Sequence, residues 1–363
     1  MANNLLSRIR RITMVLIFVV ACLQLYACAS PVRNALPEAL VPSAQIPDID
    51  LAYDWGDQVS SELDKHLNET AEIRDRLVSE RGEAYLEKPV YYLTISGGGS
   101  NGAYGAGILN GWSNAGTRPL FNIVTGISTG AIIAPFAFLG SEYDGVLREI
   151  YTQYRTSDTL QFRSILDALF GDSAADASGM KTLIRQYIDD EVMRAIANEY
   201  KNGRSLFIGT TNLDAGRPVT WNIGRIAASG APHALSLIQD IILASASIPG
   251  VFPPVMIEYE ADGKRYQEMH VDGGVTRQVF FFPGALRLHK IFKELGFTGR
   301  QKLYIIRNSI LEQRREVVKA NIFAISARSI GTLIQNQSIG DLYRLYLIAQ
   351  KNDMAYHLTH IPQ

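Results

Sequence analysis

A continuous apolar run followed at once by consecutive glycines is the feature that most limits how this chain can fold. Residues 90–95, Val-Tyr-Tyr-Leu-Thr-Ile, are rich in β-branched and aromatic side chains, which is typical of a strand buried on both faces of a parallel sheet. After the glycine-rich turn 96–102 we expect a helix over 102–114, a second strand over 121–125 and a second helix over 131–139. This order predicts parallel neighbouring strands joined by a right-handed crossover.

The rest of the chain adds strands and helices to this unit. Asp262-Gly263 stands between two strand-like runs and predicts a hairpin turn, because such a turn needs positive φ at its centre. Residues 144–204 are mostly helical in pattern, and so is the chain from residue 309 to the end. The further strands that we expect lie at residues 205–211, 219–223, 255–260, 264–271 and 302–307.

Composition excludes several classes of protein. With 47% hydrophobic and 20% charged residues, the 363-residue chain is globular in character. A net charge of -1 and the absence of a basic block in the body argue against nucleic acid as a partner. The two cysteines, Cys22 and Cys28, lie near the N-terminus, which excludes a disulfide framework or a cysteine-built metal site in the body. No cofactor or metal is expected, and the oligomeric state is not predicted.

The N-terminus carries the pattern of an exported chain. Residues 1–27 combine three arginines with a short apolar run, as a signal peptide does. Leu25-Tyr26-Ala27-Cys28-Ala29 resembles the bacterial lipoprotein cleavage box. That resemblance implies acylation of Cys28 and a place in the bacterial cell envelope, lipid-anchored in the outer membrane and facing the periplasm. Residues 28–58 contain four prolines and no periodicity, which predicts an extended tether, and residues 59–85 predict a surface helix.

A glycine-flanked serine is the first candidate catalytic residue. Gly126-Ile127-Ser128-Thr129-Gly130 stands between the second strand and its helix, where a G-x-S-x-G elbow forces the serine into a tight turn. Ser128 would then lie at the N-terminus of a helix, whose free amides and dipole favour developing negative charge. The same pattern also occurs in ordinary turns, so its context decides.

The context is the loop Ser96-Gly97-Gly98-Gly99-Ser100-Asn101-Gly102 after the preceding strand. Consecutive glycines allow several backbone amides to point into one cavity and form an oxyanion hole. The loop also matches the G-x-G-x-x-G pattern of dinucleotide-binding proteins. A dinucleotide site needs an acid about 20 residues further on, whereas residues 88–141 contain no Asp or Glu. This absence favours the oxyanion hole.

The base that accepts the serine proton must be His or Asp. Asp272, in Val271-Asp272-Gly273-Gly274, ends a strand at the edge where a carboxylate would be presented. A Ser-Asp-His order would need His289, His357 or His360, all in helical, mixed-charge settings. His270 lies on the same side of its strand as Asp272, and we expect it to be a packed side chain.

Taken in order, SGGGSNG, GISTG and VDGG, together with the block 244–254 (ASASIPGVFPP), resemble the patatin-like phospholipase family over about residues 88–310. The resemblance implies a three-layer α/β/α sandwich with a mostly parallel central sheet and added helices, a catalytic domain over 86–310 and a helical extension over 311–363. It also implies a Ser-Asp dyad and an oxyanion hole. Asn101 stands where the family often has Arg or Lys. The residues it assigns are Ser128 and Asp272 for catalysis, Gly97, Gly98, Gly99 and Ser100 for the oxyanion hole, and Gly102, Gly126, Gly130, Gly273 and Gly274 as motif glycines.

These assignments predict a serine acyl hydrolase acting on acyl esters of phospholipids or other lipids, held at a membrane by its lipid anchor. A carboxylate of ordinary pKa is a weak base for a serine hydroxyl, so we expect burial to raise the pKa of Asp272. The apolar run 279–283 is a candidate lining for an acyl chain or a part of the core. Two alternatives are a catalytically silent lipid-binding lipoprotein and a histidine-dependent α/β esterase.

Overall fold

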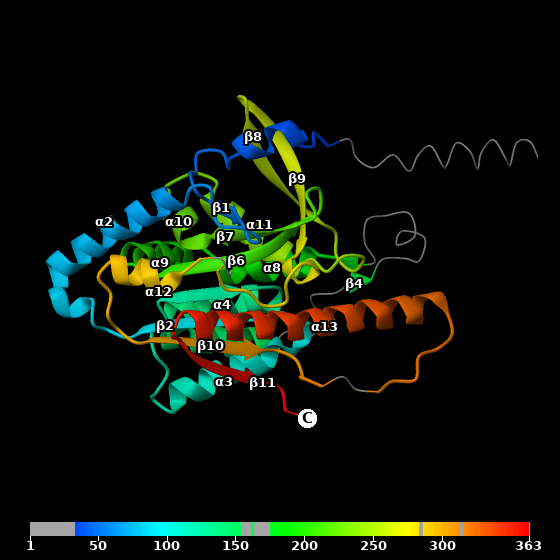
Figure 1. Cartoon of the computed structure of the whole chain (residues 1–363). Helices are drawn as coiled ribbons and strands as arrows, with labels where there is room; N and C mark the ends of the chain where they lie inside the picture. The colour runs from blue at the N-terminus through cyan, green and yellow to red at the C-terminus, as the bar shows by residue number, and fades with distance from the viewer. Residues whose placement is uncertain (1–32, 154–160, 163–174, 283–285, 313–314, 363) are drawn as a thin grey trace, which may run out of the picture.

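The computed structural model describes residues 33–153, 161–162, 175–282, 286–312 and 315–362 (Figure 1). Within these ranges the chain is built on a nine-stranded mixed sheet. Its strands are, from one edge to the other, β1 (Tyr53–Trp55), β7 (Arg217–Asn222), β6 (Ser205–Asn212), β3 (Ile123–Gly126), β2 (Val90–Ile95), β10 (Gln301–Arg307) and β11 (Ala355–His360), with β9 (Lys264–Asp272) paired to β6 and to β8 (Val255–Ala261).

Neighbouring strands from β6 to β11 run parallel, while β1, β7, β8 and β9 pair antiparallel with their neighbours. The expected mostly parallel centre is therefore confirmed. A separate two-stranded sheet joins β4 (Gln161–Phe162) and β5 (Ala175–Asp176).

Helices cover both faces of the sheet and complete the three layers. On one face, the larger core joins buried residues of the sheet to α3 (Gly102–Asn114), α4 (Thr129–Leu139), α5 (Asp144–Gln153), α8 (Ser178–Tyr187), α9 (Asp190–Lys201), α10 (Ile223–Ala228) and α11 (Ala234–Ala246). On the other face, a smaller core joins β2 and β10 to α12 (Leu288–Glu294) and α13 (Ile322–Lys351). Helix α2 (Leu63–Arg81) buries Leu77.

The short 3-10 turns are η1 (Glu38–Ser43), η2 (Glu83–Tyr85), η3 (Gly99–Asn101), η4 (Ser141–Tyr143) and η5 (Gly273–Val275). The expected hairpin is confirmed, because β8 and β9 meet at Asp262 and Gly263, whose φ angles are 49° and 67°. The helix expected over 102–114 is α3 itself.

The C-terminal part of the chain differs from the helical extension expected over 311–363. Helix α13 ends at Lys351, and Asp353 follows with a φ of 53°. The chain then adds β11 to the sheet, parallel to β10. The helical prediction is therefore wrong over 355–360. This strand lies at the edge of the sheet and is only partly buried, so its sequence lacks the apolar run that identifies an inner strand.

The expected tether over 28–58 is wrong from residue 33 onward, and residues 28–32 lie outside the described part. Ala44, Ile46, Ile49 and Ala52 are buried in the larger core, and β1 pairs with β7. The prolines and the missing periodicity predicted a segment that does not pack on the domain. A segment without regular secondary structure can nevertheless bury its side chains, and it does not need to space them regularly to do so.

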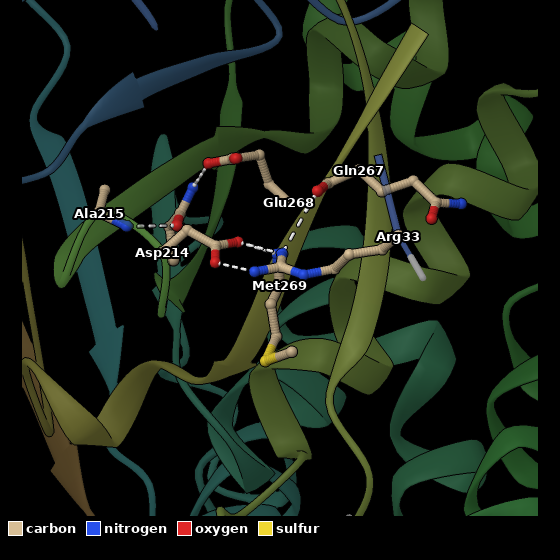
Figure 2. A network of polar contacts seen from close by, with 7 residues as sticks. Arg33, Asp214, Ala215, Gln267, Glu268 and Met269 are labelled. Atoms are coloured by element: carbon tan, nitrogen blue, oxygen red, sulfur yellow. Dashed lines mark hydrogen bonds and ion pairs between the residues drawn. The ribbon is translucent and has the colours of Figure 1, made fainter. Parts of the chain in front are cut away.

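A polar network fixes the start of this segment (Figure 2). The Arg33 guanidinium forms an ion pair with Asp214, with a distance of 2.5 Å between Nη1 and Oδ2. The same carboxylate accepts the backbone amide of Met269 at 2.8 Å. Arg33 thereby connects the N-terminal segment to the loop after β6 and to β9, three residues before Asp272.

This packing generates a stability prediction. Replacing Ile46, which is 3% exposed, with alanine should lower the free energy of unfolding by about 2 to 4 kcal/mol, since a buried isoleucine is lost and a cavity remains. The matched change Ile322→Ala, at a residue that is 74% exposed, should have little effect. Urea unfolding of both variants makes the comparison, and equal stabilities would mean that residues 33–52 do not pack on the domain.

Candidate active site

Ser128 lies in a strained turn between β3 and α4. Its φ is 56° and its ψ is -126°, a region that side chains other than glycine rarely adopt and that is found at functional sites. The turn is closed by backbone contacts, because a Cβ on Gly126 would lie 2.3 Å from the carbonyl oxygen of Gly130. A Cβ on Gly130 would likewise lie 2.3 Å from the carbonyl oxygen of Ile95. The expected elbow is therefore confirmed as a structure.

Ser245 supports this turn from helix α11. Its hydroxyl accepts the backbone amide of Ser128 at 3.0 Å and donates to the carbonyl of Gly209 at 2.7 Å. Ser245 is fully buried. It belongs to the block 244–254, but nothing in the sequence distinguished it from Ser247.

The course of the sheet brings Asp272 beside Ser128. Strand β3 pairs with β6 as far as Gly126 and Ile208, and then turns away at the elbow. Strand β9 pairs with β6 from Thr210 and Asp272 onward, and the opposite edge of β6 is occupied by β7 over this stretch. Asp272 therefore enters the position that β3 leaves.

The two side chains lie close together. The Asp272 carboxylate accepts the backbone amide of Gly274 at 2.7 Å, and the Ser128 side chain is near enough to lower its pKa. Both side chains are buried, with Ser128 6% and Asp272 5% exposed. Burial raises the pKa of Asp272 to about 6, and the Ser128 side chain and the Gly274 amide oppose this rise. The expected direction of the pKa shift is confirmed.

The glycine-rich loop lies against Ser128. A Cβ on Gly97 would lie 3.2 Å from the Cβ of Ser128. However, the Gly97 amide donates to the carbonyl of Gln278 at 3.1 Å, so it is not free to bind an oxyanion as expected. The amides of Gly98, Gly99 and Ser100 donate to no protein group among the described residues. These are the amides available for negative charge.

Asn308 holds this loop in place, and the sequence analysis missed it. It follows β10 and is fully buried. Its side chain donates to the carbonyl of Ser96 at 2.9 Å and accepts the amide of Gly105 at 3.0 Å. Its own carbonyl packs so closely on Gly98 that a Cβ there would lie 2.3 Å from the oxygen. A polar residue directly after a buried parallel strand was the signal that could have identified Asn308.

The remaining motif glycines also lie in close contacts. A Cβ on Gly102 would lie 2.0 Å from the Thr129 hydroxyl oxygen. A Cβ on Gly273 would lie 2.5 Å from the Gly209 carbonyl oxygen. One on Gly274 would lie 2.9 Å from the Asp272 carboxylate. Cys28, the expected lipidation site, lies outside the described residues.

His270 is a packed residue, as expected. Its two ring nitrogens face the hydroxyls of Thr210 at 3.0 Å and Tyr259 at 3.1 Å. Burial lowers the pKa of His270 to about 3, so the ring is neutral near pH 7. His289 contacts Asn352, and His357 stacks on Tyr304.

A buried cation lies further along the same edge of the sheet. Asn101, where the resembling family often carries Arg or Lys, is exposed. Arg307, the last residue of β10, is 1% exposed, and its guanidinium nitrogens have no hydrogen-bond partner in the part of the chain that the structure describes. Arg307 thus places a buried positive charge directly before Asn308, on the strand that pairs with β2.

The apolar run 279–283 lies mainly away from the elbow. Phe281 and Phe282 line a cavity of about 260 Å³, together with residues of α2 and α12. The cavity is also lined by Val90, Ile123 and Ser205, which begin their strands, whereas Ser128 follows the end of β3. Pro283 lies outside the described residues.

With this geometry established, the comparison with known proteins identifies the family. The family model described as patatin-like phospholipase matches residues 93–283 of the sequence. This range is more than half of the 363 residues and includes both Ser128 and Asp272. The chain therefore belongs to the patatin-like phospholipase family. No curated protein matches the chain.

Two solved structures that match the chain share little sequence with it. VipD from Legionella pneumophila is 11% identical, with a TM-score of 0.34 over 68% of this chain and 53% of VipD. Human GIVD cytosolic phospholipase A2 is 10% identical, with a TM-score of 0.30 over 79% of this chain and 52% of that protein. The chain thus spans about half the length of each. Similarity this low carries no argument about function.

The raised pKa of Asp272 predicts an unusual dependence of stability on pH. The folded state holds this proton more tightly than the unfolded state, whose carboxyl has a pKa near 3.8. The contribution to stability is therefore present below about pH 4 and is lost as the pH rises to about 6, a loss on the order of 3 kcal/mol. The variant Asp272→Asn has no titrating group at this position and therefore lacks this pH-dependent contribution.

The measurement is urea unfolding of both proteins at pH 4 and pH 7. Wild type should be less stable relative to Asp272→Asn at pH 7 than at pH 4. A difference between the two proteins that does not change with pH would show that Asp272 keeps its ordinary pKa in the folded state.

Proposed function

We propose that the chain is a serine hydrolase that cleaves acyl esters of phospholipids or related lipids through a Ser128–Asp272 dyad. The observation that carries this proposal is that the pairing of β3 and β9 with β6 brings the buried Asp272 carboxylate beside Ser128, near enough for the serine side chain to lower the carboxyl pKa. The strained backbone of Ser128 adds support, since such strain persists where the surroundings enforce it. Family membership supports the lipid class of substrate.

In the first half of the reaction, the Ser128 oxygen attacks the ester carbonyl carbon while Asp272 takes the hydroxyl proton. The carbonyl oxygen becomes an oxyanion and accepts hydrogen bonds from the amides of Gly98, Gly99 and Ser100. Donors of this kind contribute roughly 3 to 4 kcal/mol each in comparable sites. The intermediate then collapses, the bond to the alcohol breaks, and the alcohol leaves with the proton from Asp272.

In the second half, water attacks the acyl-serine and gives a proton to Asp272. Collapse of the new intermediate releases the fatty acid, and the proton on Asp272 returns to the Ser128 oxygen. No histidine takes part. His270, the histidine two residues from Asp272, faces hydroxyls with both ring nitrogens, which disfavours the histidine-dependent esterase.

Turnover of a soluble short-chain ester tests the dyad and separates it from the two alternatives. Ser128→Ala and Asp272→Asn should each lower kcat by about 10³-fold or more, as loss of a nucleophile or its base does in related chemistry. His270→Gln, His289→Gln, His357→Gln and His360→Gln are the controls and should retain turnover. Loss of activity in a folded histidine variant would favour the esterase, and an inactive wild type would favour the silent lipid-binding protein.

The pH profile provides a second prediction. Asp272 must be ionised to accept the proton, and its pKa is raised to about 6. The value of kcat/KM for a neutral ester should therefore rise with pH and level off above about pH 6 to 7. A profile that is already flat at pH 4 would contradict the assignment of Asp272 as the base.

The lipid anchor at Cys28 and the outer-membrane location remain proposals from the sequence, since residues 1–32 lie outside the described part. They agree with the proposed activity, because an anchored enzyme is held where lipid esters are concentrated.

A further inference from the structure

Helix α13 has a packed half and a free half. Its second half buries Leu342, Leu345 and Ile348 in the smaller core. In its first half, residues 322–337, no side chain that the structure describes is buried. Figure 1 shows this half, in orange, extending past the ends of the strands. The first half of this long helix therefore contributes no side chain to the core among those that the structure describes.

The free half carries large apolar side chains. Ile322, Ile325, Ile330 and Leu333 are between 51% and 74% exposed, and Val317 in the preceding loop is 88% exposed. Tyr343, Tyr346 and Leu347 continue the exposed apolar surface along the second half. Most large apolar side chains exposed in the described part of the chain lie between residues 317 and 347. A concentration of this kind marks an interaction surface.

This surface lies at the same edge of the sheet as Ser128. Helix α13 connects the parallel strands β10 and β11, so it runs back from the carboxyl ends of the strands. Gln335 donates to the carbonyls of Ile310 and Leu311, at 2.9 and 3.2 Å, just after β10 ends. Residues 322–334 therefore project beyond this edge by roughly 20 Å.

The charges select the kind of partner. Asp341 is the one acid in α13, and it is buried, whereas the Arg344 side chain is 53% exposed. Arg315 and Lys319 in the preceding loop are also exposed, as are Glu312 and Glu316, and Glu316 pairs with Arg328 of α13. Over residues 312–344 the sequence has five Arg and Lys against three Asp and Glu, an excess of basic residues. Exposed apolar side chains with basic neighbours are typical of helices that lie on membrane surfaces.

We propose that the first half of α13, with Val317, is an interfacial segment that inserts its apolar side chains into a phospholipid surface. It would lie in the plane of the interface, and among the described residues no helix is long and apolar enough to span a membrane. This inference deepens the proposed function and rests on it, because it holds the domain, and with it Ser128, close to the membrane surface that contains the substrate.

A chain of contacts joins the second half of α13 to the oxyanion loop. The Asp341 carboxylate accepts the backbone amide of Gln278 at 2.8 Å, and the carbonyl of Gln278 accepts the amide of Gly97 at 3.1 Å. The helix that would dock on the membrane is therefore also connected, through Gln278, to the glycine-rich loop.

A site-specific fluorophore tests the proposal in the full chain. Cys22 and Cys28 are the only cysteines, so Cys22→Ser and Cys28→Ser give a background for single labels and remove the proposed anchor. A polarity-sensitive dye is then attached at Leu333→Cys, or at Leu120→Cys as the matched control. Leu120 is 58% exposed and precedes β3, at the opposite edge of the sheet.

Vesicles of phosphatidylcholine with phosphatidylglycerol should shift the emission of the dye at 333 to the blue and leave the dye at 120 unchanged. The shift should persist with Ser128→Ala, which separates docking from catalysis. An unchanged emission at 333, or equal shifts at both positions, would overturn the proposal. A blue shift at 333 that rises with protein concentration and without lipid would instead identify a second copy as the occupant, and would also overturn it.

Activity gives a second readout. The triple change Ile322→Ser, Ile325→Ser and Leu333→Ser should lower turnover of vesicle phospholipid more than tenfold, while leaving turnover of a soluble short-chain ester within about twofold, since each 1.4 kcal/mol of lost binding is tenfold. Equal loss on both substrates would contradict interfacial docking. If wild type cleaves neither substrate, the proposed function fails while the fluorescence result still decides the docking.

Discussion

Close backbone contacts at the carboxyl edge of the sheet determine the geometry of the whole site. The elbow at Ser128 closes only because Gly126 and Gly130 allow backbone atoms to approach where a Cβ would collide. The strained φ of Ser128 costs on the order of 1 to 3 kcal/mol, and the buried hydrogen bond to Ser245 helps to hold it. Since β3 ends there, β9 can continue along β6 and deliver Asp272 to the serine.

The same burial that positions Asp272 also sets its chemistry. A solvated carboxylate would be ionised but weakly basic, whereas removal from water raises the pKa of Asp272 to about 6. The Ser128 side chain and the Gly274 amide limit this rise and keep the carboxylate ionised near neutral pH. The site therefore gains a better base and loses some stability, a trade-off that is common at active sites.

Much of the catalytic unit could be predicted from the sequence because its signals are local. A buried apolar run, glycines at fixed positions and the Asp262-Gly263 turn each determine the backbone within a few residues. The dyad needed the family resemblance in addition, because Ser128 and Asp272 are brought together only by the pairing of β3 and β9 with the same strand.

The features that the sequence did not reveal depend on contacts between segments that are distant in the chain. Asn308 and Gln278 hold the glycine-rich loop from other parts of the chain, and Gln278 occupies the Gly97 amide that the motif alone assigns to the oxyanion hole. Strands β1 and β11 pack at the margins of the sheet, where partial burial leaves little periodic pattern. Local patterns could not show which surfaces cover them.

The central claim is that Ser128 is the activated nucleophile. Its most direct test is mass spectrometry of the peptide modified when the folded full-length protein reacts with a fluorophosphonate probe. The modification should lie on Ser128 and should be lost when Asp272 is changed to asparagine. Modification of another serine, or undiminished labelling of Ser128 in that variant, would contradict the dyad.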